Sequence, residues 1–263
     1  MNQADRKKLE GGVFVVTGGT QGLGQTIAMH LAELGAAAVV ICGRNQEKGR
    51  KVEAALGAAG TSGLYIKADL LKADDCRRVI AACDDRFGVL TGLVNAGAST
   101  ARGTIIDTTV EQWDQMMALN LRAPFILMQE SIKIFKRERK GGSIVNILSI
   151  SAHGGQPKLT AYCTSKGALL TLTKNVAHAV RDDRIRVNGL NIGWMATPGE
   201  HEIQQAEGAP DNWLEIADGQ APFGRILRPL DVARLVAFLL SSDGEMMTGS
   251  TIDYDQMVIG AFD

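Results

Sequence analysis

Short apolar runs rich in β-branched residues alternate with longer amphipathic stretches along this 263-residue chain. Runs that are apolar at nearly every position are typical of parallel strands buried on both faces. The candidate strands are 13–17, 37–42, 63–67, 90–95, 142–148, 185–190 and 250–253. The candidate helices between them are 22–34, 45–58, 72–86, 110–138, 160–181 and 231–241. We expect the helix from 110 to break before Pro124, and Asp231 to cap the last helix.

Strict alternation of strand and helix forces parallel pairing, because each crossover helix returns the chain in the same direction. The predicted fold is therefore α/β, a doubly wound Rossmann-like domain with a seven-stranded parallel sheet and helices on both faces. The length suits one domain over 1–263, with no repeat or linker inside it. The proline-rich stretch 191–230 is predicted to form a lid over a substrate site.

Composition and charge exclude several classes of protein. The formal charge of −1 leaves no surplus for nucleic acid or anionic lipid, so neither nucleic acid nor a membrane is an expected partner. The four cysteines and four histidines are scattered without CxxC spacing, which predicts neither a metal site nor a disulfide framework. Together with a polar segment at 1–10, this favours a cytoplasmic protein.

A glycine-rich turn at Gly18–Gly24 follows the first strand and opens the first helix. Glycine suits this place because a Cβ would block the approach of a pyrophosphate to the free N–H groups of the helix. The spacing GxxxGxG differs from the GxGxxG of the Rossmann fingerprint, and a glycine turn alone is a weak signal. Its position between strand and helix predicts a dinucleotide site.

The end of the second strand reads Cys42-Gly43-Arg44-Asn45. In the GxGxxG fold an acidic residue about 20 positions after the turn binds the 2′-hydroxyl of the adenosine ribose. Here Arg44 stands in place of a carboxylate, and its guanidinium can fork onto the oxygens of a 2′-phosphate. This favours NADP as the cofactor. Glu47 keeps NAD possible, and a merely solvated Arg44 is the alternative interpretation.

Tyr162 and Lys166 lie four residues apart at the head of a helical pattern, so their side chains share one helix face. A tyrosine has a pKa of about 10, and a nearby ammonium favours the phenolate and lowers that pKa. Tyr162 is then a candidate acid in reduction and a candidate base in oxidation. A Tyr and a Lys at this spacing are common on helix surfaces, so the other motifs in the chain must decide whether this pair is catalytic.

The glycine turn, Asn95-Ala96-Gly97, Asn120, Ser149 and Tyr162-x-x-x-Lys166 together resemble the short-chain dehydrogenase/reductase family over roughly 11–256. The resemblance implies an enzyme that transfers hydride between a nicotinamide cofactor and a secondary alcohol or ketone. It implies that Tyr162 transfers the proton and that Lys166 lowers its pKa and binds the nicotinamide ribose. It also implies that Ser149 positions the substrate oxygen, that Asn120 holds a proton-relaying water, and that the protein is a homotetramer.

By the same resemblance, Asp69 and Leu70 meet the adenine, and Asn95–Gly97 line the cofactor cleft. The predicted cofactor-binding residues are Gly18, Thr20, Gln21, Gly22, Leu23, Gly24, Arg44, Asn45, Asp69, Leu70, Asn95, Ala96, Gly97, Tyr162, Lys166, Gly193 and Thr197. Taken singly, Asp69, Asn95 and Ser149 could instead serve as a cap, a loop bond and a strand-end hydroxyl. The chain departs from the family pattern where Ile192 replaces a proline and where Asp253-Tyr254-Asp255-Gln256 replaces a glycine-rich end.

The predicted substrate-binding residues are Ser149, Ser151, His153, Tyr162 and Trp194. Gln156, His201 and Trp213 are further candidates, although Trp213 could simply anchor a lid helix. Polar groups beside indole faces suit a sugar or sugar alcohol, which is the first substrate prediction. An NADPH-dependent 3-oxoacyl thioester reductase is the alternative enzyme, and a cofactor-binding sensor is the alternative outside enzymes. Apolar positions on several faces of 110–138 and 160–181 predict a subunit interface.

Overall fold

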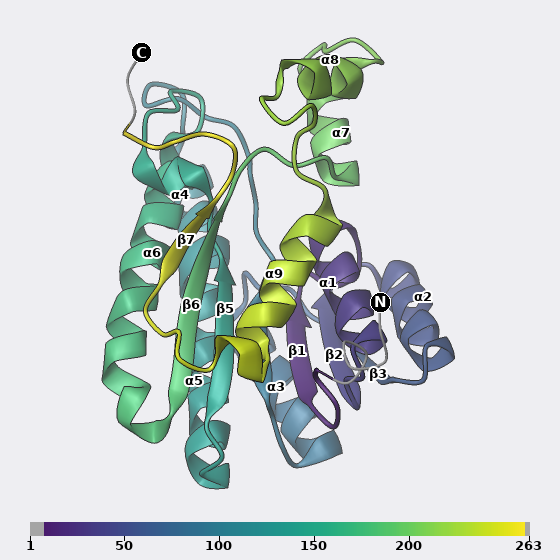
Figure 1. Ribbon diagram of the computed structural model, residues 1–263. Coiled ribbons are helices and arrows are strands. Elements are labelled where there is room, and N and C mark those ends of the chain that lie inside the picture. The colour runs from purple at the N-terminus through teal and green to yellow at the C-terminus, as the bar shows by residue number, and fades with distance from the viewer. Residues whose placement is uncertain (1–7, 261–263) are drawn as a thin grey trace.

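A computed structural model describes residues 8–260 and contains one seven-stranded sheet with helices on both faces (Figure 1). The strands are β1 (Val13–Thr17), β2 (Ala38–Gly43), β3 (Ser62–Lys67), β4 (Gly92–Asn95), β5 (Gly142–Ile147), β6 (Ile185–Ile192) and β7 (Thr251–Tyr254). All neighbouring pairs are parallel, and the order across the sheet is β3-β2-β1-β4-β5-β6-β7. The predicted doubly wound parallel sheet is confirmed.

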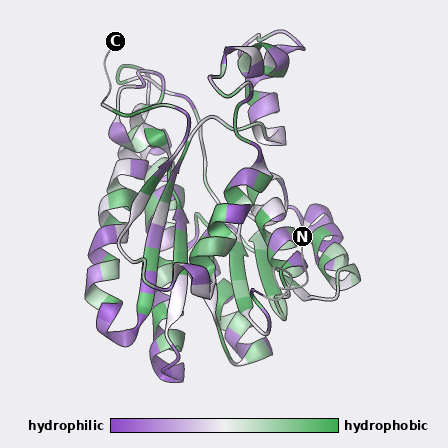
Figure 2. Cartoon of the chain, in the orientation of Figure 1, coloured by the Kyte–Doolittle hydropathy of each residue, from purple (hydrophilic) through white to green (hydrophobic). Residues whose placement is uncertain are grey.

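The helices form a layer on each face of the sheet (Figure 1). They are α1 (Gly22–Glu33), α2 (Gln46–Ala58), α3 (Ala73–Phe87), α4 (Val110–Met117), α5 (Ala123–Glu138), α6 (Thr160–Val180), α7 (Pro198–Ala206), α8 (Trp213–Gln220) and α9 (Pro229–Leu240). Phe14 and Val16 pack toward α1, α2 and α9, whereas Val13 and Val15 pack toward α3, α5 and α6. This alternation explains why the whole strand is apolar, as its colour in Figure 2 shows.

The α-helix from 110 is interrupted before Pro124, as predicted, but the chain stays on a helical path. A π-helical stretch over Ala118–Arg122 joins α4 directly to α5. Proline has no N–H for the preceding turn, and here the helix widens instead of ending, with the Ala123 N–H donating five residues back to Ala118 O. Asp231 does cap α9, but as its third residue: its carboxylate accepts from the Arg228 N–H at 2.9 Å.

Helices α7 and α8 project beyond the carboxyl edge of the sheet, between β6 and α9 (Figure 1). The buried Trp213 donates its indole N–H to His201 Nδ1 at 2.8 Å, which joins α8 to α7. Trp213 therefore anchors the predicted lid from inside, and His201 serves as its partner. No helix within residues 8–260 is long and apolar enough to cross a membrane.

Candidate active site

The glycine turn and the Asn95-Ala96-Gly97 loop meet where the strand order reverses between β1 and β4. A Cβ on Gly18, which has a φ of +66°, would lie 2.8 Å from the Gly97 Cα, so only glycine permits this contact. Thr17 Oγ1 accepts from the Ala96 and Gly97 N–H groups, both at 3.0 Å. Crevices at such reversals are where open α/β sheets bind ligands.

The N-terminus of α1 opens into this crevice. Its N-cap residue, Gln21, makes no capping hydrogen bond with its side chain, and the first turn contains no acidic residue. The first N–H groups of the helix, together with the positive end of its dipole, suit a pyrophosphate. Just before the Ala96-Gly97 loop, the Asn95 Oδ1 atom is buried and has no hydrogen-bond partner within residues 8–260. These features fit the dinucleotide that the sequence predicts.

The region predicted for the adenosine is also assembled. Leu70 is buried against Gly97, and the Asp69 carboxylate accepts from the Leu71 N–H at 3.1 Å. Asn45 Oδ1 accepts from the Lys48 N–H at 2.9 Å, so part of the Asn45 amide caps α2. Arg44 is exposed at the end of β2.

Lys48 is a residue that the sequence analysis missed. Its Nζ donates to Gln21 Oε1 at 2.6 Å, which places a second cation between α2 and the glycine turn. The only sequence signal is its position four residues after Arg44, on the face of α2 that turns toward α1.

The predicted catalytic side chains come together from β5 and α6. Ser149 follows β5, and its hydroxyl lies on the same side of the cavity as the Tyr162 hydroxyl, close enough to lower the pKa of that phenol. Lys166 Nζ donates to Ile147 O at 2.7 Å and lies 5.7 Å from the centroid of the Tyr162 ring. All three side chains are buried. The serine and the phenol thus present two hydroxyls to one point, as acid–base chemistry on an alcohol oxygen requires.

The ionisation of these groups differs in one respect from the prediction. Burial raises the pKa of Tyr162 above its usual value, although the Ser149 hydrogen bond and the Arg102 guanidinium act in the opposite direction. Burial also lowers the pKa of Lys166 to about 8. The Lys166 ammonium lies over the ring and donates to Ile147 O, and the lowering of the phenol's pKa by Lys166 stays a prediction.

Asn120 lies in the π-helical stretch, and its side chain is fully engaged. Its Oδ1 accepts from the Ser99 N–H at 2.9 Å, and its Nδ2 donates to Ser99 O at 2.9 Å and to Ser165 Oγ at 3.1 Å. The side chain therefore fastens the loop after β4 to the catalytic helix α6. The predicted water-holding role would have to use the main chain of Asn120.

Comparison with known proteins agrees with this geometry. Residues 18–256 match the family model described as Enoyl-(Acyl carrier protein) reductase. An NADP-dependent (R)-specific alcohol dehydrogenase of Lentilactobacillus kefiri is 32% identical over 251 residues, which cover 94% of this chain and 96% of that one. The chain belongs to the short-chain dehydrogenase/reductase family. It is an oxidoreductase acting on CH–OH groups.

Two further relatives of this short-chain dehydrogenase/reductase have named substrates or ligands. A 2,5-dichloro-2,5-cyclohexadiene-1,4-diol dehydrogenase of Sphingobium indicum is 32% identical over 248 residues, covering 94% of this chain and 96% of its own. A solved variant of actinorhodin polyketide ketoreductase with NADPH superposes with a TM-score of 0.87 at 26% identity, covering 92% of this chain and 95% of its own. Relatives that use NADP and NADPH support a nicotinamide cofactor for this enzyme.

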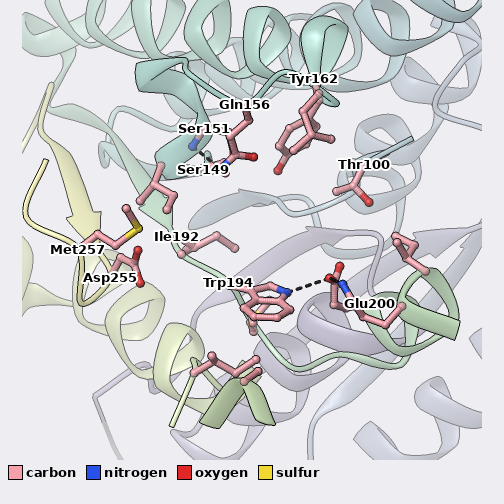
Figure 3. A pocket seen from close by; sticks show the side chains of 18 of the residues that line it. Thr100, Ser149, Ser151, Gln156, Tyr162, Ile192, Trp194, Glu200, Asp255 and Met257 are labelled. Carbon is pink, nitrogen blue, oxygen red and sulfur yellow. Dashed lines mark hydrogen bonds between the residues drawn. The ribbon is translucent and has the colours of Figure 1, made fainter. Parts of the chain in front are cut away.

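A cavity of about 1000 Å³ lies between the catalytic residues and the lid (Figure 3). Six predicted site residues line it: Ser149, Ser151, Tyr162, Gly193, Trp194 and Thr197. Gln156 lines it too, and its Oε1 accepts from the Ser151 hydroxyl at 3.1 Å. The cavity is thus bounded by the segment after β5, the start of α6 and helices α7 and α8.

His153 is the predicted substrate residue that the structure places elsewhere. It does not line the cavity; its Nε2 pairs with Asp253 Oδ1 at 2.9 Å, and Asn191 Nδ2 donates to the same oxygen at 2.6 Å. His153 therefore connects the segment after Ser149 to the ends of β6 and β7. Sequence alone could not show this contact, because Asp253 lies 100 residues further along the chain.

Both departures from the family pattern border the cavity. Ile192 lines it where the family has a proline, and the following residue stays anchored because the Gly193 N–H donates to Tyr254 O at 3.1 Å. The Asp255 carboxylate lies against the Gly193 Cα, where a Cβ would collide with it. Asp255 thus brings a carboxylate into the wall of the substrate cavity (Figure 3).

Proposed function

We propose that this enzyme transfers hydride between NADP(H) and a secondary alcohol or ketone of a polyhydroxylated substrate, a sugar or a sugar alcohol. The observation that carries the proposal is that Ser149 and Tyr162 line the same cavity, with the serine close enough to the phenol to lower its pKa. When bound, the nicotinamide supplies the hydride donor or acceptor.

Residues of the chain itself transfer the proton and bind the substrate oxygen. In reduction, the Tyr162 hydroxyl donates a proton to the substrate oxygen, and in oxidation the phenolate accepts it. Ser149 holds that oxygen by hydrogen bonding beside Tyr162. Lys166, whose pKa is lowered to about 8, exchanges protons close to neutral pH and favours the phenolate when charged. Burial of all three groups strengthens these interactions.

The preference for NADP rests on Arg44 and Lys48. Arg44 is exposed at the end of β2, and Lys48 Nζ reaches the glycine turn through Gln21. Two cations beside the predicted adenosine end favour a 2′-phosphate, because the guanidinium and the ammonium both bind phosphate oxygens. The NADP-dependent relative supports the same choice. NAD remains the alternative cofactor.

The lining of the cavity supports a polyhydroxylated substrate. Hydroxyl, amide and carboxylate groups of Ser151, Gln156 and Asp255 face the same space as the partly exposed indole of Trp194. Such groups bind substrate hydroxyls, and an indole face packs on the C–H surface of a ring. The cyclohexadienediol dehydrogenase among the relatives acts on a ring that carries hydroxyls. A 3-oxoacyl thioester is the second candidate, and the family model, described as an enoyl-(acyl carrier protein) reductase, supports it only in that both substrates are acyl thioesters.

A substrate panel tests the proposal directly. Sugars, sugar alcohols, cyclic diols and 3-oxoacyl thioesters are each assayed with NADP(H) and NAD(H) by the absorbance of the reduced nicotinamide. We expect turnover of a sugar or polyol with NADP(H). Turnover of thioesters alone would replace the first candidate by the second. Cofactor binding with no turnover of any alcohol or ketone would instead favour a sensor.

We also propose a homotetramer working in the cytoplasm. A hollow of about 800 Å³ between α4–α5 and α6 is lined by apolar side chains such as Met117, Leu121 and Leu172, and Phe125 beside it is 45% exposed. A second copy of this face would cover these side chains. The four free thiols suit a reducing compartment. Sedimentation velocity measures the assembly, and a monomer would contradict it.

A further inference from the structure

Glu200 of the lid helix α7 connects three parts of the substrate cavity. Its side chain is 14% exposed, and its Oε1 accepts from the Trp194 indole N–H and from Gln204 Nε2, both at 2.8 Å. Its own N–H donates to Thr197 Oγ1 at 3.1 Å, which fixes the start of the helix. Figure 3 shows the Trp194 indole held edge-on to this carboxylate at the cavity wall.

Arg102 approaches the same carboxylate from the opposite side of the cavity. Its Nη2 lies 3.9 Å from Glu200 Oε1, and its Nε donates to Glu207 Oε1 at 3.2 Å. The loop of Arg102 is fixed to the start of α6, because the Gly103 N–H donates to Lys158 O at 2.9 Å and the Thr160 N–H donates to Gly103 O at 3.1 Å. The ion pairs therefore join the base of the catalytic helix to the lid.

We propose that Glu200 is a positioning residue of this enzyme, whose carboxylate holds the Trp194 indole as a wall of the substrate cavity and balances the charge of Arg102 beside Tyr162. The proposal rests on the proposed function only in taking this cavity as the substrate site. Oε1 already accepts two hydrogen bonds, so its role is to fix protein groups. Without it, the half-exposed indole loses its polar anchor, and substrate loses a fixed surface to pack against.

The charges around Tyr162 support the second half of the proposal. The titratable and polar groups around Tyr162 are Ser149 after β5, Cys163 and Lys166 from α6, and the two members of the ion pair. Arg102 lowers the pKa of Tyr162, whereas Glu200 raises it. Removing only the charge of Glu200 takes away a group that raises the pKa of Tyr162 and leaves Arg102, which lowers it, so the pKa of the phenol falls.

Three variants separate these roles. Glu200→Gln keeps an oxygen that can accept from the Trp194 N–H but removes the charge, and Glu200→Ala removes both. Glu202→Gln is the matched control, because Glu202 is exposed on the same helix and lies outside the cavity. Far-ultraviolet circular dichroism of each variant establishes that the fold is retained.

The kinetic test uses an alcohol that the panel identifies. We expect Glu200→Ala to raise KM about tenfold with kcat changed less than about threefold, because one hydrogen bond that orders the cavity wall is lost. Glu200→Gln should leave KM within about threefold of the parent. In the pH dependence of the oxidation rate, both Glu200 variants should move the acid limb to lower pH. Glu202→Gln should change neither KM nor the position of that limb. An unshifted limb, or equal KM values for Glu200→Ala and the parent, would overturn the proposal.

A second readout does not need turnover. Acrylamide quenching of the Trp194 fluorescence, taken as the part absent from Trp194→Phe, should increase in Glu200→Ala and stay at the parent value in Glu200→Gln. Unchanged quenching in Glu200→Ala would refute the positioning role. If no alcohol or ketone is turned over, the proposed function fails, and the quenching result still decides whether Glu200 positions Trp194.

Discussion

Because Lys166 is buried, we predict that its charged side chain destabilises the folded protein even though turnover requires it. Burial lowers its pKa from 10.5 to about 8, and at about 1.36 kcal/mol per pKa unit this destabilises the folded state at pH 7 by roughly 3 kcal/mol. Lys166→Met removes the buried charge and also the hydrogen bond to Ile147 O, whose loss costs about 1 kcal/mol. We therefore expect the variant to be more stable than the parent at pH 7 by about 2 kcal/mol, while turnover is lost.

The sign of the pH dependence follows from the same two values. Between about pH 8 and 10.5 the unfolded chain binds the proton and the folded chain does not, so the stability of the parent rises through this range and is flat below it. The advantage of Lys166→Met should then shrink to nearly nothing by about pH 9.5.

Urea unfolding at one fixed protein concentration, at pH 7 and at pH 9.5, measures this difference. Lys174→Met is the control, because Lys174 is exposed on the same helix and its replacement should change stability by less than about 0.5 kcal/mol. A Lys166→Met variant that is less stable than the parent at pH 7 would refute the reasoning. So would an advantage that stays constant with pH.

Three further predictions test other parts of the site. Tyr162→Phe should bind the reduced cofactor as the parent does but turn over at least about 100-fold more slowly, measured by fluorescence titration and by rate; normal turnover would remove the acid–base assignment. Arg44→Ala should weaken NADPH binding about tenfold and leave NADH binding unchanged, and equal affinities in the parent would contradict the cofactor preference. Gly24→Ala places a Cβ against Gly18 O and should destabilise by about 1–3 kcal/mol in urea, whereas Gly57→Ala, with nothing within 4 Å, is the control that should not.

The sheet and the glycine turn could be predicted because their signals are local. The run 13–17 coincides with β1, since every residue of that strand is buried and all but Thr17 are apolar. The turn at Gly18 is specified by a strand, a glycine spacing and a helix that are contiguous in sequence. Strand β6 extends to Ile192, whereas the predicted strand ended at 190. The last two residues belong to the strand because Asn191 and Ile192 pair with Asp253 and Tyr254, each 62 positions away. A strand end fixed by a distant partner has no local pattern.

The residues predicted to be catalytic could be recognised in the sequence, whereas the contacts of the lid could not. Ser149, Tyr162 and Lys166 carry fixed spacings on two neighbouring elements, so sequence alone places them together. Arg102 meets Glu207 across 105 residues, through a loop and a lid helix that contain no motif. In the sequence, charged side chains on such segments cannot be distinguished from ordinary solvent-exposed residues. Only the contact itself identifies them as part of the site.

Two buried asparagines in the otherwise apolar sheet connect the strands to the helix that carries Tyr162. The same hydrogen bonds therefore stabilise the fold and position the candidate active site. Asn95 and Asn146 lie opposite each other in β4 and β5, and Asn95 Nδ2 donates to Asn146 Oδ1 at 2.8 Å. Asn146 Nδ2 donates in turn to Thr173 Oγ1 of α6 at 2.9 Å. A buried amide whose bonds fit only one register fixes that register, because any slip leaves it unpaired. The helix that carries Tyr162 is thereby held in register with β4 and β5, and the Asn95 oxygen, which has no partner among the described residues, lies next to the loop predicted to line the cofactor cleft.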